Sequence, residues 1–428
     1  MDVSEFQGLL EKGLGRAPIY LQDHDSSPYR HAILYACTHD QRYERWVEDC
    51  RAVYLMDIIR FSRDMAFYRS KILAALQEPA EDESAGQMFQ IARLLAERGD
   101  AEARRVMIDT FKRHAAQGDF TGVFDLIELD GWDALIMAAG YLLGQADRED
   151  AVRDYHMWIG DLRERDGEQA MQQALAQAAE QHPEIAPLLE AMRAYEEKLE
   201  ADRQLWRTER LPDYAILKQS IARHGSKTKR LRLWGRKADA EALRQAAADL
   251  MAEQDTDRLI AYLRIFQDRD FPLPFDRLLG LACSADKAVV HATANVLERI
   301  RHPDIRALAL ELSQSSERYR YGIQLLARNY QEGDYDLLES LLEKPLDTDN
   351  YHQLGIGARD FIEQNLTVEA ERPLIQLYEN SPCSFCRQFW VRSLMALGRL
   401  PEWMRAECRY DANPDIREMV CTKSLPVL

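Results

Sequence analysis

The feature that most constrains the fold of this chain is a succession of short apolar stripes with helical spacing. In residues 286–300, the apolar positions that share one helix face are Val289, Ala292, Val296 and Ile300. Residues 388–399 show the same periodicity, whereas no run of alternating β-branched residues flanks an Asn-Gly or Asp-Gly turn. The chain contains 20 Gly and 15 Pro among 428 residues, together about 8%. This share is lower than the roughly 12% of an average protein. The sequence therefore predicts an all-α fold.

The number of these helical segments indicates how they are arranged. About twenty of them follow one another through short connections, which make consecutive helices antiparallel neighbours. A single hydrophobic core stops growing at roughly 250–300 residues, so one bundle cannot hold them all. A stack of helix pairs solves this problem, because each pair buries its apolar face against its neighbours only. We therefore expect a right-handed α-solenoid of helical hairpins.

Internal similarity supports this expectation. The tetrapeptide Pro-Asp-Ile-Arg occurs at 303–306 and again at 414–417, and Pro-Glu-Ile at 183–185 is a weaker echo. The separations, 111 and 120 residues, are interpreted as three repeats of about 37 and of about 40 residues, close to the length of helical-hairpin repeats. Pro opens a helix, the acidic residue favours its positive end, and Ile begins the buried stripe.

Two segments resemble the HEAT-repeat family. Residues 284–292, Ser-Ala-Asp-Lys-Ala-Val-Val-His-Ala, look like a HEAT first helix, with Leu297 as the later leucine. Residues 413–417 are similar to the Asp-x-x-Val-Arg pattern of the same motif, with Ile in place of Val. The resemblance covers about 280–428 and implies a stack that holds a partner protein, less often a nucleic acid, on its inner helices. Some members are enzymes, among them alkyl-base DNA glycosylases and phycobilin lyases, but none of their functional residues can be carried over to this chain.

Charge divides the sequence unevenly. The net charge is −17, and residues 1–200 sum to −16, residues 201–250 to +6 and residues 251–428 to −7. A chain this acidic repels phosphate backbones over most of its surface, so generic binding of nucleic acids or of a membrane surface is disfavoured. We expect acidic N-terminal helical repeats or a cap in 1–200, a basic connecting segment in 201–240 and C-terminal HEAT-like repeats in 241–428.

The basic segment is the most unusual feature of the chain. Residues 214–238 contain no acid and eight cations, of which the first is Lys218. The candidate binding residues are Lys227, Lys229, Arg230, Arg232, Trp234, Arg236 and Lys237. Three interpretations stay open. The segment neutralises the acidic N-terminal half, it docks an acidic partner protein, or it grips phosphates while Trp234 stacks on a base.

The cysteines suggest a metal site as a less favoured alternative to core packing. Cys383 and Cys386 form a C-x-x-C at a predicted helix start, and Cys408 and Cys421 follow downstream. Four thiolates can bind Zn²⁺ tetrahedrally, although the downstream spacing differs from that of a zinc ribbon. Cysteine is also a common small buried hydrophobe. Seven cysteines, an odd number, argue against a secreted disulfide framework.

Histidines near the N-terminus suggest a second metal hypothesis. The cluster consists of His24-Asp25, His31 and His39-Asp40, near Asp57, and it could hold ions that activate water in a phosphohydrolase. The same residues serve equally well as helix caps and surface groups. The chain contains no Walker A loop, no G-x-G-x-x-G after a strand, no H-E-x-x-H and no G-x-S-x-G.

Tryptophans give a weaker indication of a binding face. The four that are candidates for such a face are Trp206, Trp234, Trp390 and Trp403. Single tryptophans at helical spacing belong more often to the core.

The function favoured by these observations is a non-enzymatic interaction scaffold that binds a partner protein or peptide on the concave face of a solenoid. The partner is expected to be acidic if it docks on 218–237. One alternative is a nucleic-acid-binding or glycosylase-like HEAT protein that uses 218–237, and another is a metal-dependent hydrolase. No cofactor is expected. The N-terminus lacks a signal-like apolar stretch and the longest apolar run is 134–144, too short for a membrane span, so we expect a cytoplasmic protein without membrane contact.

Overall fold

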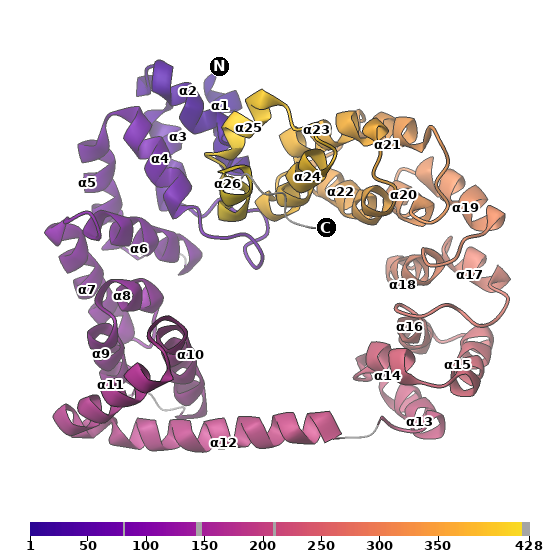
Figure 1. Ribbon diagram of the computed structural model, residues 1–428, viewed down its shortest axis with the longest axis horizontal. Coiled ribbons are helices and arrows are strands. Elements are labelled where there is room, and N and C mark those ends of the chain that lie inside the picture. Colours follow the sequence, from indigo (N-terminus) through magenta and orange to yellow (C-terminus); the bar gives the residue numbers. More distant parts are fainter. Residues whose placement is uncertain (80–81, 143–147, 209–210, 422–428) are drawn as a thin grey trace. The chain divides into compact units, whose positions relative to one another are not determined.

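A computed structural model of the chain describes residues 1–79, 82–142, 148–208 and 211–421. These residues form twenty-six α-helices and four short 3₁₀ helices, and they contain no β-strand (Figure 1). The predicted all-α class is therefore confirmed. None of the helices in the described ranges combines the length and the apolar character that a membrane crossing requires.

The helices form two compact units. As far as their residues are described, unit 1 comprises Met1–Glu209 and Pro401–Pro426, and unit 2 comprises Arg210–Leu400. Unit 1 is therefore formed by roughly the first half of the chain together with the last two helices of the chain, α25 and α26. The boundary expected near 200 agrees with this division, whereas 401–428 were expected to belong to the C-terminal repeats.

Unit 1 contains fourteen of the α-helices of the described ranges. They are α1 (Val3–Lys12), α2 (Arg16–Asp23), α3 (Arg30–Thr38), α4 (Ala52–Ser62), α5 (Met65–Leu76), α6 (Asp82–Ala96), α7 (Ala101–Ala115), α8 (Val123–Asp130), α9 (Trp132–Leu142), α10 (Arg148–Asp166), α11 (Glu168–Gln181), α12 (Ala186–Thr208), α25 (Glu402–Cys408) and α26 (Pro414–Cys421), with 3₁₀ helices η1 (Ser27–Tyr29) and η2 (Pro183–Ile185).

Helices of unit 1 pack on their second neighbours in the chain. One series consists of α2, α4, α6, α8, α10 and α12, each in contact with the next, and the other of α1, α3, α5, α7 and α9. Sequential helices such as α6 and α7 join the two series. A helix such as α6 therefore packs both against its own series, at α4 and α8, and against the adjacent series, at α5 and α7.

The last two helices, α25 and α26, complete unit 1 by packing on its first helices. The backbone N–H of Ala412 donates to the carbonyl of Gly13 at 2.9 Å, and Arg16 Nε pairs with Glu407 Oε1 at 2.6 Å. A Cβ on Gly15 would lie 1.8 Å from the carbonyl oxygen of Glu407. Gly15 is thus required by a close backbone approach between segments that are almost 400 positions apart.

Unit 2 contains the other twelve α-helices of the described ranges. They are α13 (Tyr214–His224), α14 (Leu231–Lys237), α15 (Ala240–Ala252), α16 (Thr256–Ile265), α17 (Asp276–Leu281), α18 (Lys287–Leu297), α19 (Pro303–Ser313), α20 (Tyr319–Leu326), α21 (Asp334–Leu342), α22 (Thr348–Gln364), α23 (Glu371–Asn380) and α24 (Ser384–Ala396), with 3₁₀ helices η3 (Gly225–Lys227) and η4 (Val368–Ala370).

The same second-neighbour packing continues in unit 2. The series α14, α16, α18, α20, α22 and α24 is in contact from each helix to the next, and sequential pairs such as α19 and α20 connect it to the other helices. The apolar stripe predicted for 286–300 falls on α18, where Val289 and Val296 are buried. The beginnings of α18, α20 and α22 lie near one another, since residues of all three line one pocket.

Aspartates set the beginnings of several helices. Asp100, Asp239, Asp255 and Asp347 each precede a helix and accept a hydrogen bond from the backbone N–H three residues later. Asp286 likewise caps α18 by accepting from Ala288 and Val289. This cap satisfies N–H groups that have no partner within the helix.

The repeated Pro-Asp-Ile-Arg does begin helices, α19 at Pro303 and α26 at Pro414. The inferred repeat length, however, is wrong. Between these two starts, where every residue is described, lie the seven helices α19 to α25. Seven helices do not make a whole number of helix pairs, so the separation of 111 residues is not three hairpin repeats.

Candidate functional site

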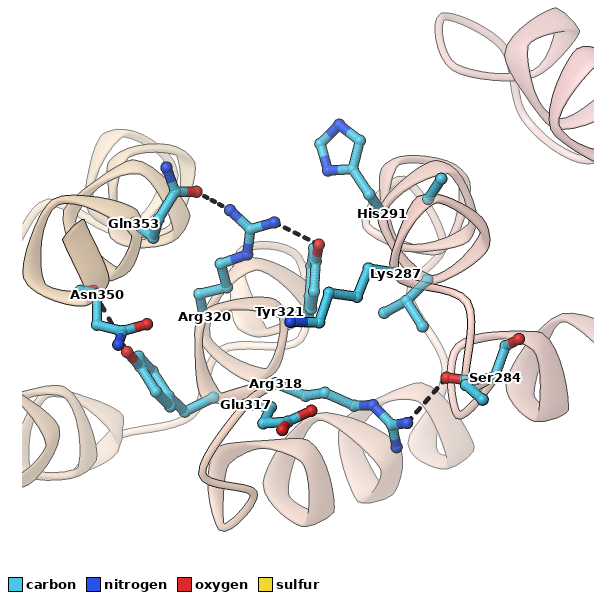
Figure 2. A pocket seen from close by; sticks show the side chains of 13 residues that line it. Ser284, Lys287, His291, Glu317, Arg318, Arg320, Tyr321, Asn350 and Gln353 are labelled. Carbon is cyan, nitrogen blue, oxygen red and sulfur yellow. Dashed lines mark hydrogen bonds between the residues drawn. The ribbon is translucent and has the colours of Figure 1, made fainter. Parts of the chain in front are cut away.

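A pocket of about 420 Å³ lies in unit 2 where three helices of one series begin (Figure 2). Its lining comes from the start of α18 and the residues before it, from residues 317–321 at the start of α20, and from Asn350 and Gln353 in the first turns of α22. The second-neighbour packing of α18, α20 and α22 brings these three segments together. We call it the cation pocket, because Lys287, Arg318 and Arg320 line it.

Three cations belong to the lining: Lys287, Arg318 and Arg320. Figure 2 shows Lys287 extending toward Tyr321, and Arg320 between Tyr321 and Gln353. Arg320 donates to Gln353 Oε1 and to the hydroxyl of Tyr321. Arg318 Nη2 donates to the carbonyl of Ser284 at 2.8 Å. Neutral oxygens therefore hold both guanidinium groups in place and leave their charge uncompensated.

The electrostatics of the cation pocket favour an anion. In the described part of the chain, no carboxylate lies within ion-pair distance of Lys287, Arg318 or Arg320, and Glu317 is the one acidic residue of the lining. Helix beginnings add the positive ends of their dipoles. No side chain caps the beginning of α20, and residues at this helix start line the pocket.

His291, on α18, also lines the pocket. Partial burial of the imidazole, and then the positive charges of Arg320 and Arg264, lower its pKa. A histidine whose pKa falls below the usual value of about 6.5 is neutral at pH 7. At neutral pH, His291 therefore acts as a neutral hydrogen-bonding group beside the three cations.

The basic segment predicted as a binding surface lies at α13, η3 and α14 of unit 2. Arg232 pairs with Asp268 at 2.6 Å, and Lys218 pairs with Asp249 at 2.7 Å. Arg236 lies 3.9 Å from the same Asp268. Asp249 belongs to α15, and Asp268 lies in the turn that follows α16.

The remaining residues of the basic segment divide into exposed cations and one core residue. Lys227, Lys229 and Lys237 are exposed, and none has a carboxylate at ion-pair distance in the described ranges. Arg230 precedes α14 in a left-handed backbone conformation, φ 64°. Trp234 is 4% exposed, and its indole N–H donates to the carbonyl of Pro212 at 2.8 Å. The interpretation in which Trp234 stacks on a base is not supported by this position, because its ring is packed inside the unit.

The cysteines divide between the two units. Cys408 and Cys421 belong to α25 and α26 of unit 1, and Cys383 and Cys386 belong to unit 2. Around the latter pair, one ligand atom each from His352, Cys383 and Cys386 lie within 4.8 Å of one another. His352 was not a candidate in the sequence analysis. Among the described residues, these three form the one such group of metal-binding side chains.

The histidines of the hydrolase hypothesis have local roles in unit 1. His24 stacks on Tyr20, with ring centroids 3.9 Å apart, and His39 stacks on Tyr35 at 4.1 Å. Each follows the last residue of a helix. Neither they nor His31 belong to the group of metal-binding side chains found in the described residues. The structure therefore does not assemble the proposed phosphohydrolase site.

The candidate tryptophans also separate. Trp390 is buried, whereas Trp403 in unit 1 is 43% exposed. The side chain of Trp206 lies outside the described part of the structure.

The cation pocket was not predicted from the sequence. Its residues come from three segments about thirty positions apart, each unremarkable by itself. One signal was available, the run Arg318-Tyr319-Arg320-Tyr321, in which two cations alternate with two aromatic residues. Comparison with protein families, curated proteins and solved structures finds no match to this chain.

Proposed function

We propose that this chain is a non-enzymatic, HEAT-like helical solenoid that binds an acidic segment of a partner protein in the cation pocket. The second-neighbour packing of successive helices within each unit supports the solenoid part of the proposal, because solenoid repeats contact chiefly their neighbours. The Asp-capped start of α18, in the segment that resembles a HEAT first helix, is consistent with it.

The observation that carries the binding part is the set of uncompensated cations at an open pocket. The chain has 72 acidic and 55 basic residues, so an arginine on its surface easily finds a carboxylate. The exposed Arg372, for example, pairs with Glu339 at 2.8 Å. Lys287, Arg318 and Arg320 converge on one pocket without such a partner in the described ranges. A ligand that supplies the carboxylates accounts for this arrangement.

The chemistry of the pocket matches an acidic peptide. Arg presents a planar fork that can bind a carboxylate through two hydrogen bonds, and Lys adds a mobile point charge. The amides of Asn350 and Gln353 and the hydroxyl of Tyr321 can contact a peptide backbone. A volume of about 420 Å³ is within the range of small-ligand pockets, roughly 300–1,000 Å³, and holds a few side chains.

Charge also argues against nucleic acid as the ligand. Nucleic-acid binding uses many phosphate contacts and a positive surface that follows the backbone. The cation pocket offers three cations on a chain whose net charge is −17. A short acidic peptide brings a few carboxylates into the pocket without extending along the acidic surface.

Fluorescence anisotropy with a short labelled peptide of Asp and Glu tests the proposal. We expect saturable binding that weakens with salt and is absent for the matched peptide of Asn and Gln. Lys287→Gln removes one exposed cation and should weaken binding about fivefold or more, on the order of 1 kcal/mol.

Lys229→Gln is the matched control, because it removes an equally exposed cation from the basic segment. Loss of affinity in Lys229→Gln, with Lys287→Gln unchanged, would place the site on the basic segment instead. A single-stranded oligonucleotide that binds more tightly than the acidic peptide would favour the nucleic-acid alternative and overturn the proposal.

A further inference from the structure

Two cysteine side chains lie close together at the start of α24 in unit 2. Cys383 is the residue that precedes α24, and Cys386 lies in its first turn. Side chains at these two positions, three residues apart, face each other at the beginning of a helix, as in a capping box. The hydroxyl of Ser381 donates to the carbonyl of Cys383 at 3.2 Å, which holds the residue before the helix. Both sulfurs are therefore positioned by the backbone of one helix start.

The third group comes from the adjacent helix of the same series. His352 is on α22, which contacts α24, and its Nε2 lies 3.3 Å from Cys386 Sγ. Close packing sets this spacing, since a Cβ on Gly355 would lie 3.4 Å from the ring of Trp390. Gly355 is one turn after His352, and Trp390 is one turn after Cys386. The two helices are thus in direct contact beside the three side chains.

We propose that His352, Cys383 and Cys386 form a zinc-binding site in unit 2. In tetrahedral zinc sites, bonds of about 2.3 Å to sulfur and about 2.0–2.1 Å to nitrogen place the S and N ligands about 3.5 Å apart and two sulfurs about 3.8 Å apart. The observed 3.3 Å between His352 Nε2 and Cys386 Sγ matches the first value. All three ligand atoms lie within 4.8 Å of one another. Small side-chain rotations can bring the two sulfurs to the separation of about 3.8 Å that a zinc site requires.

Burial and charge suit this ion. Cys383 is fully buried and His352 is 5% exposed, whereas Cys386 is partly exposed. Binding of Zn²⁺ releases one proton from each thiol. One dication, two thiolates and a neutral imidazole make a group without net charge, which avoids the cost of a buried charge. The positive end of α24 further favours thiolates at Cys383 and Cys386. Water, from the side of Cys386, supplies the fourth ligand.

The site joins two helices. Zinc bound to all three residues links α22 to α24, and the same two turns of α22 carry Asn350 and Gln353 of the cation pocket. The zinc site stands on its own geometry, so its test does not depend on peptide binding.

Metal titration of the purified full-length chain, reduced and stripped with a chelator, tests the proposal. We expect about one Zn²⁺ per chain, and with Co²⁺ the visible bands of a tetrahedral cobalt thiolate site. Cys386→Ser and His352→Gln should each weaken metal binding at least about tenfold. Cys283→Ser and Cys421→Ser, which remove exposed thiols, should retain full binding.

Two results would overturn the zinc site. One is equal retention of Zn²⁺ by the wild-type chain and by both ligand variants. The other is failure of the reduced wild-type chain to bind Zn²⁺ or Co²⁺. Thermal melting of each variant in chelator distinguishes loss of a ligand from loss of the fold, because a folded variant melts like the metal-free wild-type chain.

Discussion

Arg417 and Asp57, 360 positions apart in the sequence, form an ion pair inside unit 1, with Nη1 and Oδ2 2.8 Å apart. Arg417 is the last residue of the second Pro-Asp-Ile-Arg. In the first copy, Arg306 makes the corresponding contact with Asp334 through two hydrogen bonds of 2.7 and 2.8 Å. Each arginine thus extends from the first turn of its helix to a carboxylate of another helix. For Arg417 that helix is α4, which lies near the beginning of the chain.

Loss of the pair between Arg417 and Asp57 should destabilise unit 1. Both side chains are more than four-fifths buried, so Arg417→Ala leaves a carboxylate without its main partner, at a cost of about 1–3 kcal/mol. Chemical denaturation of Arg417→Ala, Asp57→Ala and the double variant gives the coupling energy, expected to be at least about 0.5 kcal/mol. Arg60→Ala is the control, since Arg60 bonds the same Asp57 from an exposed position. Additive effects of Arg417→Ala and Asp57→Ala would contradict this account.

Stability of unit 2 should fall as pH rises from about 4.5 to about 7. Burial, together with the charge of Asp360, raises the pKa of Glu298 to about 7, against the opposing effects of Gln324, Arg299 and Arg328. Across this interval the folded chain keeps a proton that the unfolded chain has released, so the free energy of unfolding decreases with pH.

Glu298→Gln removes this titration while keeping the shape of the side chain. The variant should therefore exceed the wild-type chain in stability at pH 8, by up to about 3 kcal/mol, and match it near pH 4. Denaturation midpoints across the pH range measure the effect, with the exposed Glu332→Gln as control. If the stability of Glu298→Gln falls with pH as steeply as that of the wild-type chain, Glu298 is not the source of the pH dependence.

Two glycine variants should have opposite effects on unit 2. A Cβ on Gly357 of α22 would lie 2.5 Å from the carbonyl oxygen of Arg320. Gly357→Ala therefore forces α20 and α22 apart, with an expected loss of about 1–3 kcal/mol and weaker binding of acidic peptide, because Arg320 moves. Gly280→Ala in α17 meets nothing within 4 Å and should stabilise by about 0.5–1 kcal/mol. Equal melting temperatures for the two variants would show that α20 and α22 are not in tight contact at Gly357.

Charge reversal in the basic segment should leave the fold intact. Lys229 has no carboxylate at ion-pair distance within the described ranges, so Lys229→Glu should melt like the wild-type chain. Arg232→Glu loses an exposed pair with Asp268 and should lose at most about 1 kcal/mol, with an effect that salt reduces. Differential scanning calorimetry at two salt concentrations measures the change in melting temperature of each variant. A larger loss for Lys229→Glu than for Arg232→Glu would contradict the positions of these side chains.

Local features of the fold could be predicted from the sequence because their causes are local. Apolar periodicity around Val289 and Val296 predicted a helix with one buried face, and Pro303 and Pro414 predicted helix starts. The repeat length failed because an identical tetrapeptide at two helix starts does not fix how many helices lie between them. The return of the C-terminal helices to unit 1 rests on contacts such as Arg417 with Asp57, which no local pattern encodes.

The candidate sites are formed by contacts between helices that are second neighbours in the chain. From the sequence, only the separate segments of each site could be recognised. The pair Cys383 and Cys386 was visible as a motif, but His352 lies 34 positions before Cys386 and only the contact of α22 with α24 identifies it. Trp234 illustrates the converse. Its interleaving with cations suggested a stacking surface, whereas burial of one face of α14 placed the ring in the core.

Covalent mapping of the bound peptide tests the central claim most directly. A carbodiimide joins a peptide carboxylate to a lysine amine when the two are in contact, and mass spectrometry of the digest identifies the lysine. Unit 2 offers several exposed lysines for comparison, among them Lys227, Lys229, Lys237 and Lys344. Binding in the cation pocket predicts that the acidic peptide is joined chiefly to Lys287, and that excess unlabelled peptide or high salt abolishes the product. Joining chiefly to Lys227, Lys229 or Lys237, or evenly to all exposed lysines, would contradict the proposed site.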